Sequence, residues 1–354
     1  MRKFLGSMCV VVGCTSSMVV DPAEPPNGDD GTGNAVDAGK ARDAAAPGDA
    51  ASDATTPTAS GQTTQIAPFS DTNPGALRMY EYVPAEMPST PAPVVVVLHG
   101  CTQTELDYTA AGWNQLADTD KFYVVYAEQT AANNAALCFN WFQREDSARV
   151  GGEAESIKRM VDSTRARHDV DDSRIFVTGL SAGGAMTAVM LAAYPDVFAA
   201  GAIMAGVPYR CATSAASTAA CAGGASGYTA AQWGDLVRAE SSSFAGAGYP
   251  RVSVWQGTAD RTVLPASADD LLAQWCNVHD IATTPTATET VGSNVVHERF
   301  AAADGTVKIE SWTIEGMDHG TAIDPTQGCG TAGPYILDAG ICSTSKAAEF
   351  FGLR

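Results

Sequence analysis

The sequence predicts an α/β fold, in which a doubly wound and mostly parallel sheet carries helices on both faces. The first observation is a continuous apolar run of strand length, PVVVVLH at residues 93–99, which is typical of a strand buried on both faces. The second is that runs of this kind alternate along the chain with segments of helical pattern, as they do in parallel βαβ units.

Each expected element has a local signal. Ile157, Met160 and Val161 fall on one face of a helix, and Pro195 stops the apolar helix that follows a glycine-rich segment. The expected strands are residues 93–99, 121–126, 174–178, 199–204, 251–255 and 307–314. The expected helices are residues 153–168, 184–194 and 346–351.

Residues 1–14 have the pattern of an export signal. A basic n-region and a short apolar region precede VVGC, which resembles the lipobox of bacterial lipoproteins. In such signals the cysteine, here Cys14, becomes the lipidated first residue, and Thr15 instead of aspartate after it indicates the outer membrane. We therefore expect an exported protein that is lipid-anchored at the outer membrane or cell surface. An ordinary signal peptide would leave it extracellular.

Residues 15–65 differ in composition from the rest of the chain. They are rich in Ala, Asp, Gly, Pro and Thr and contain no aromatic residue through position 60. Such a segment cannot bury enough apolar area to offset its chain entropy, so we expect a disordered tether. The α/β pattern begins at about Ile66, and the expected catalytic domain therefore spans residues 66–354.

Composition excludes several classes of function. The formal net charge of −19 over 354 residues repels phosphate backbones, so nucleic acid is not an expected partner. No stretch reaches the roughly 18–20 apolar residues that span a bilayer, and membrane contact is expected only through the anchor. The nine cysteines include no CxxC pair, so no metal site is expected, and their number indicates an oxidising compartment. The sequence does not indicate an oligomeric state.

Residues 179–183 (GLSAG) match the motif G-x-S-x-G. The match lies directly between an expected strand and an expected helix, which is the nucleophile-elbow arrangement of the α/β-hydrolase fold. The flanking glycines tolerate a tight turn, and the helix N-terminus favours a developing anion. Ser181 is therefore the expected nucleophile. The alternative is a glycine-rich turn that contains an ordinary serine.

A serine nucleophile needs a base, and His319 is the best candidate. It lies in the turn GMDHG after the last expected strand and is the last histidine of the chain, as the order Ser…Asp/Glu…His requires. The remaining histidines are less suitable because they lie in charged or polar segments or, as His99 does, at the end of a buried strand. That position favours a structural or oxyanion-site role.

The orienting carboxylate should follow a strand between these two residues. Asp260 lies in the turn after residues 251–255, and its competitor is Asp318, the neighbour of the histidine. For the oxyanion hole, which needs two preorganised donors, the expected groups are the backbone N–H of Ala182 and that of Cys101, in the loop after the first long strand.

Five segments resemble the poly(3-hydroxybutyrate) depolymerase family of esterases, which is similar to feruloyl and acetylxylan esterases. They are LHGCTQT (98–104), CFNWF (138–142), GLSAGGAM (179–186), YPDVFAA (194–200) and QGTADRTV (256–263). The resemblance implies an α/β-hydrolase carboxylesterase with the triad Ser181, Asp260 and His319. The substrate-pocket candidates are His99, Trp141 and Gln256.

The family pattern also implies a disulfide between Cys101 and Cys138, at the mouth of the site. Closeness in sequence alone suggests two further disulfides, which would leave Cys276 as a free thiol. These further pairs are Cys211 with Cys221 and Cys329 with Cys342.

We therefore expect a serine carboxylesterase that hydrolyses short-chain or hydroxyacyl esters, such as hydroxybutyrate-type oligomers, through an acyl-enzyme and without a cofactor. The alternative enzyme is a feruloyl or acetylxylan esterase acting on plant cell-wall polysaccharide. The alternative that is not an enzyme is an inactive lipoprotein that binds material at the cell surface. Because about 35 residues follow His319, no polymer-binding domain is expected there, and soluble oligomers should be preferred to crystalline polymer.

Overall fold

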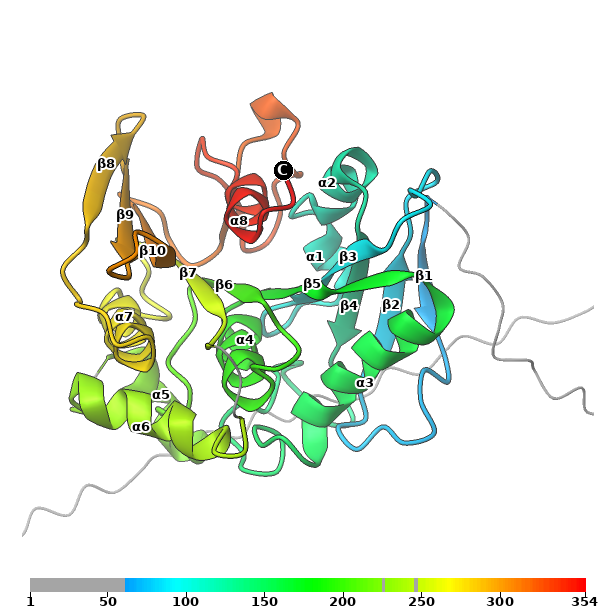
Figure 1. Ribbon diagram of the computed structural model, residues 1–354, viewed down its shortest axis with the longest axis horizontal. Helices are drawn as coiled ribbons and strands as arrows, with labels where there is room; N and C mark the ends of the chain where they lie inside the picture. The colour runs from blue at the N-terminus through cyan, green and yellow to red at the C-terminus, as the bar shows by residue number, and fades with distance from the viewer. Residues whose placement is uncertain (1–60, 225–226, 245–247) are drawn as a thin grey trace, which may run out of the picture. The chain divides into compact units, whose positions relative to one another are not determined.

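The computed structural model describes residues 61–224, 227–244 and 248–354 (Figure 1). The expected export signal, Cys14 and the tether up to residue 60 lie outside the described residues. The first strand of the described residues begins at Thr63, three residues before the expected start at Ile66. This strand has no apolar run of its own, and it is held by antiparallel pairing with the next strand.

Within the described residues, ten strands form one sheet, whose central strands all run parallel. Both edges of the sheet are antiparallel. The expected mostly parallel sheet is confirmed. In sheet order the strands are β1 (Thr63–Ile66), β2 (Arg78–Tyr82), β4 (Tyr123–Glu128), β3 (Ala92–Leu98), β5 (Val170–Leu180), β6 (Ala200–Met204), β7 (Arg251–Gly257), β10 (Val307–Ile314), β9 (Val295–Ala301) and β8 (Ala287–Val291). A separate parallel pair consists of β11 (Thr321–Ile323) and β12 (Ile336–Asp338).

Helices cover both faces of the sheet, as expected. In Figure 1, α3, α4, α6 and α7 lie below the sheet, and α1, α2 and α8 lie above it. The helices are α1 (Glu105–Thr109), α2 (Trp113–Asp120), α3 (Gly152–Arg167), α4 (Ala182–Ala193), α5 (Thr218–Ala222), α6 (Ala230–Glu240), α7 (Ala266–Val278) and α8 (Ser343–Phe351). Short 3₁₀ turns occur at Ala215–Ser217 and Pro325–Gln327.

Each face of the sheet has its own apolar core. Strand β3 contributes to both, because successive strand side chains point to opposite faces. Val94 and Val96 pack into the core beneath the sheet, whereas Val95 and Val97 pack into the core above it. All seven residues of β3 are buried, which explains why this strand has the continuous apolar run seen in the sequence.

The expected elements that differ from the structure do so for local reasons. The strand expected at residues 121–126 begins at Tyr123, because Lys121 adopts φ 58° and caps the C-terminus of α2. The edge strands β1, β2, β8 and β9 were not expected. Strand β8 (ATETV) has three exposed residues in its centre, so its position is set by pairing with β9 and not by an apolar pattern.

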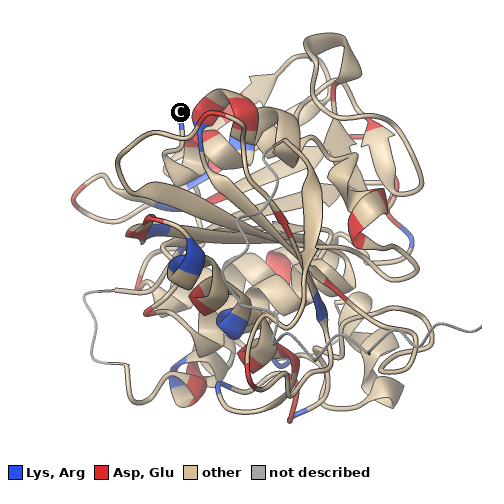
Figure 2. Cartoon of the chain, turned by 90° about the vertical axis from the view of Figure 1, so that its right-hand side faces the viewer, with Lys and Arg blue, Asp and Glu red and all other residues tan. Residues whose placement is uncertain are grey.

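Charged side chains are sparse. Figure 2 shows acidic and basic residues interspersed on the described elements that face the viewer. On α3 they form pairs one turn apart, such as Lys158 with Asp162 at 2.6 Å. Among the described residues, no helix is long and apolar enough to cross a membrane.

Candidate active site

Ser181 occupies a sharp turn between β5, which ends at Leu180, and α4, which begins at Ala182. Its backbone angles are φ 57° and ψ −117°, a region that residues other than glycine rarely adopt and that clusters at functional sites. The Ser181 N–H donates to the carbonyl of Met204 at 2.9 Å, which ties the turn to β6. The turn therefore has the geometry expected of a nucleophile elbow.

The glycines on either side of Ser181 are required by close backbone contact. A Cβ on Gly179 would overlap the backbone of Gly183. A Cβ on Gly183 would in turn overlap the carbonyl oxygens of Leu98 and His99 at the end of β3. The first turn of α4 therefore packs directly against two strands, which explains why the sequence has glycine at both positions.

His319 follows β10 and binds the expected carboxylate. Its Nδ1 lies 2.7 Å from Oδ2 of Asp260, and both side chains are buried. Since a carboxylate only accepts, Nδ1 carries a proton and donates it to Asp260, and in the neutral imidazole the lone pair is then on Nε2. This is the tautomer that a general base for a serine requires.

Asp260 is held by further donors. Its Oδ1 accepts from the backbone N–H groups of Thr262 at 2.8 Å and Val263 at 2.9 Å, and Oδ2 also accepts from Nε2 of Gln256 at 3.2 Å. Burial raises the pKa of Asp260, but the hydrogen bond and charge of His319, together with the backbone N–H groups of Val263 and Thr262, hold it below its ordinary value. The side chain is therefore ionised at neutral pH.

Asp318, the competing carboxylate, has a different partner. Its Oδ1 accepts the backbone N–H of His319 at 2.8 Å, so this oxygen binds the main chain and not the imidazole. The other histidines bind away from Ser181. His168 contacts Glu81, His279 contacts the Pro250 carbonyl, and His297 contacts Glu289 and Glu310.

The candidate oxyanion donors lie beside the serine. Ala182 is the first residue of α4, where an N–H has no acceptor within the helix. In the loop after β3, the N–H of Gly100 donates to Gln103 Oε1 at 2.8 Å and that of Thr102 to the Ala136 carbonyl at 2.8 Å. This leaves the N–H of Cys101 as the loop's candidate donor.

Two cavities meet at Ser181. The smaller, of about 130 Å³, is also lined by His319, Gln103 and Tyr335, and the Tyr335 ring packs edge-on against His319 with centroids 5.9 Å apart. The larger, of about 260 Å³, is lined by Trp141 among others. Cys101 lines both cavities.

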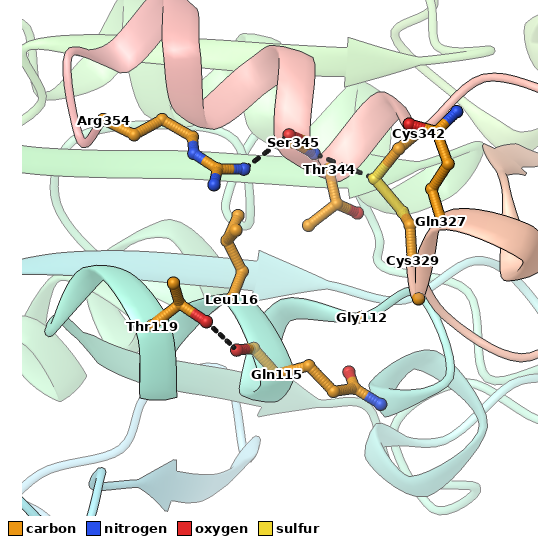
Figure 3. A pocket seen from close by; sticks show the side chains of 11 residues that line it. Gly112, Gln115, Leu116, Thr119, Gln327, Cys329, Cys342, Thr344, Ser345 and Arg354 are labelled. Atoms are coloured by element: carbon orange, nitrogen blue, oxygen red, sulfur yellow. Dashed lines mark hydrogen bonds between the residues drawn. A yellow bond between two sulfur atoms is a disulfide. The ribbon is translucent and has the colours of Figure 1, made fainter.

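A hollow of about 380 Å³ lies elsewhere, between α2, α8 and the disulfide of Cys329 and Cys342 (Figure 3). Arg354 is its one charged lining residue, and no serine–histidine pair lines it. The larger volume therefore does not make it the reactive site. Within the described residues, no cluster of histidine, cysteine and carboxylate side chains could hold a metal ion.

Of the three substrate-pocket candidates, the structure places only Trp141 in a cavity wall. His99 is buried behind the loop, where Nδ1 bonds the Gly100 carbonyl at 2.7 Å and Nε2 accepts from the Gln129 N–H at 3.0 Å. Burial lowers the pKa of His99, so its ring is neutral. Gln256 is buried and its amide binds Asp260. His99 and Gln256 therefore support the site from behind, where they do not face a substrate.

Glu153 was not expected at the site from the sequence, although it begins the expected helix over 153–168. It is buried at the start of α3 and accepts from Nε2 of Gln129 at 2.6 Å and from the backbone N–H of Asn140 at 2.7 Å. Burial raises its pKa to about 8, against the opposing effect of these donors. Through Gln129, which also bonds His99, Glu153 links the loop of Trp141 to the loop of Cys101.

The structure contains the three disulfides expected from the sequence. Their Cα–Cα separations of 4.1, 5.4 and 5.8 Å are all below the limit of about 7 Å for a bridge. Cys276 is free and buried. Three disulfides are characteristic of proteins from oxidising compartments. The pairs are Cys101 with Cys138, Cys211 with Cys221, and Cys329 with Cys342.

The chain is similar to known proteins over most of its length. The family model described as "Esterase PHB depolymerase" matches residues 77–294. The chain belongs to this esterase family. A relative within the PHB depolymerase esterases, poly(3-hydroxyalkanoate) depolymerase C of Paucimonas lemoignei, is 50% identical over 293 residues, which are 82% of this chain and 70% of that protein.

Two further proteins resemble this PHB depolymerase family esterase. Feruloyl esterase B of Talaromyces funiculosus is 32% identical over 264 residues, 72% of either chain. A solved acetyl xylan esterase from Aspergillus awamori matches with a TM-score of 0.70 at 27% identity, over 83% of this chain and 100% of that one. The chain is thus a carboxylic ester hydrolase. The matched family segment includes Ser181 and Asp260 and ends before His319.

We predict that Gly183→Ala abolishes most ester hydrolysis by this PHB depolymerase family esterase. The added Cβ would overlap the backbone at the end of β3, and displacing a reacting group by about 1 Å can cost on the order of 100-fold in rate. Overpacking should also destabilise the fold by about 1–3 kcal/mol. The measurements are kcat on p-nitrophenyl butyrate and urea unfolding.

Gly333→Ala is the matched control for this substitution, because its Cβ would meet nothing within 4 Å. It should keep the activity and stability of the unmodified enzyme. Unchanged kcat in Gly183→Ala would contradict the close packing of α4 against β3.

Proposed function

We propose that Ser181 is the nucleophile of a serine carboxylesterase, with His319 as its base and Asp260 as the orienting carboxylate. The observation that carries this proposal is the 2.7 Å contact between His319 Nδ1 and Asp260, in a cavity that His319 and Ser181 line together. The backbone N–H groups of Cys101 and Ala182 bind the oxyanion.

The reaction proceeds in two halves. His319 Nε2 takes the hydroxyl proton as Ser181 Oγ attacks the ester carbonyl carbon. Collapse of the tetrahedral intermediate breaks the bond to the alcohol oxygen, which receives that proton from Nε2. Water then attacks the carbonyl carbon of the acyl-enzyme and gives a proton to Nε2. The bond to Ser181 Oγ breaks, the free acid forms, and Oγ takes the proton back from Nε2. The residues named are sufficient for this cycle without a cofactor.

The proposed substrates are short-chain or hydroxyacyl esters, such as hydroxybutyrate-type oligomers. Support comes from the 50% identity to a protein named poly(3-hydroxyalkanoate) depolymerase C, which exceeds the 32% identity to feruloyl esterase B. A feruloyl or acetylxylan esterase is the alternative. The two hypotheses are separated by comparing the turnover of hydroxybutyrate trimer, methyl ferulate and acetylated xylan. A preference for ferulate or xylan would overturn the proposal of hydroxyacyl esters.

Ser181→Ala is expected to abolish ester hydrolysis and covalent labelling by a fluorophosphonate while the circular dichroism spectrum stays unchanged. Only the hydroxyl is removed, from a turn that main-chain bonds define. Retained turnover in the folded variant would reject Ser181 as nucleophile. Failure of the unmodified protein to label or to turn over any ester would favour an inactive surface-binding protein.

Asp260→Asn should lower kcat by about 10⁴-fold, the effect of this change in serine proteases, because an amide can hold the imidazole in the wrong tautomer. Asp318→Asn is the matched control and should change kcat by less than about tenfold, since its carboxylate binds the main chain. Both are measured by kcat on p-nitrophenyl butyrate. The reverse ranking would assign the third position of the triad to Asp318.

The proposed location is the outer membrane or cell surface, through a lipid on Cys14 and a tether over residues 15–65. Support comes from the lipobox-like VVGC and from three disulfides, which fit an oxidising compartment. In a Gram-negative host, the full chain should sediment with membranes, whereas Cys14→Ser should appear in the soluble exported fraction. Equal soluble release of both would indicate an ordinary signal peptide.

A further inference from the structure

A third apolar cluster lies beside Ser181, apart from the cores on the two faces of the sheet. Its buried members are Ala185, Val207, Ala212, Cys221 and Val263, with Trp141 and Phe142 packed against them. Five of these side chains, together with others around them, line the cavity of about 260 Å³ that reaches Ser181. An apolar cavity that opens at a nucleophile is the expected form of a substrate pocket.

The position of His319 decides which half of an ester this cavity receives. The leaving alcohol must lie on the side of the imidazole, because His319 gives its proton to the alcohol oxygen. His319 and Tyr335 line the smaller cavity of about 130 Å³ and are absent from the lining of the larger one. With the carbonyl carbon at Ser181, the acyl chain therefore points into the larger cavity.

We infer that the cavity between Trp141, Phe142 and α5 is the acyl pocket, and that it selects aliphatic acyl groups larger than acetyl. This inference rests on the proposed serine mechanism. It assigns the alcohol to the cavity of Tyr335 and gives α5 control of acyl length.

The volume and walls of the pocket favour aliphatic acyl groups larger than acetyl. An acetyl group has three heavy atoms, and at the roughly 30 Å³ of one water molecule each it would leave more than half of the 260 Å³ empty. By the same measure about eight heavy atoms fill the space, which corresponds to an acyl group of about seven carbons with its carbonyl oxygen. Ala185, Ala219 and Ala222 create this room, because their side chains end at Cβ.

Helix α5 is held firmly enough to act as a wall. The Cys211–Cys221 disulfide joins α5 to the loop before it, and the Leu264 N–H donates to the Ala222 carbonyl at 2.8 Å. Ser267 Oγ adds a bond to the same carbonyl at 3.1 Å. A larger side chain on the inner face of α5 should therefore shorten the pocket, because the helix is not free to move away.

The test uses adjacent exposed alanines of α5. Ala219 lines the pocket, whereas Ala220 does not. For Ala219→Leu we expect kcat/KM on p-nitrophenyl hexanoate to fall at least tenfold, with p-nitrophenyl acetate changed less than twofold. Ala220→Leu should leave the whole acyl series, from acetate to octanoate, unchanged. Because the alcohol is the same throughout, the series reports the acyl side alone.

A second series with butyrate as the common acyl group and methyl, butyl and benzyl alcohols completes the test. Ala219→Leu should leave the ranking of these alcohols unchanged. A changed alcohol ranking with an unchanged acyl ranking would reverse the assignment of the cavities. An equal loss on every ester would also overturn the proposal, since it would show a catalytic and not a selective effect. Either result could occur with Ser181 as nucleophile, so the serine mechanism is tested separately by Ser181→Ala.

Discussion

The site depends on how closely the first turn of α4 approaches β3 and β5. Gly179 and Gly183 permit this approach, because a Cβ on either would overlap neighbouring backbone. Ser181, in the turn between these elements, has a positive φ of 57°, and the Ala182 N–H lies at the start of the helix beside the loop of Cys101. The proposed nucleophile and one proposed oxyanion donor are thus positioned by the same packing contact.

Buried polar groups and disulfides hold the surrounding loops at fixed positions. Glu153 binds Gln129 and Asn140, and Gln129 also binds His99 behind the Cys101 loop. The Cys101–Cys138 disulfide joins the same two loops covalently. Since these loops supply a candidate oxyanion donor and the Trp141 wall, a change at Glu153 would act on the site through their positions.

The apolar cluster beside Ser181 differs from the two cores in its role. The cores cover the faces of the sheet. This cluster, which includes Val207 and Val263, instead lines a cavity. Its walls are alanine-rich on the α5 side and aromatic on the side of Trp141 and Phe142. In the proposed acyl pocket, size selection would depend on single residues of α5 and not on the sheet or the proposed triad.

The sequence by itself determined the parallel centre of the sheet and the strand–turn–helix arrangement at Ser181, because these depend on local patterns such as PVVVVLH and GLSAG. Tertiary structure alone decided the rest. His99 and Gln256 carry polar groups suited to a pocket, yet both bind protein groups behind it, since a side chain's neighbours across the sheet are not encoded in its own segment. Glu153 and the alanines of α5 gain their roles in the same way, from segments far apart in the sequence that meet only after folding.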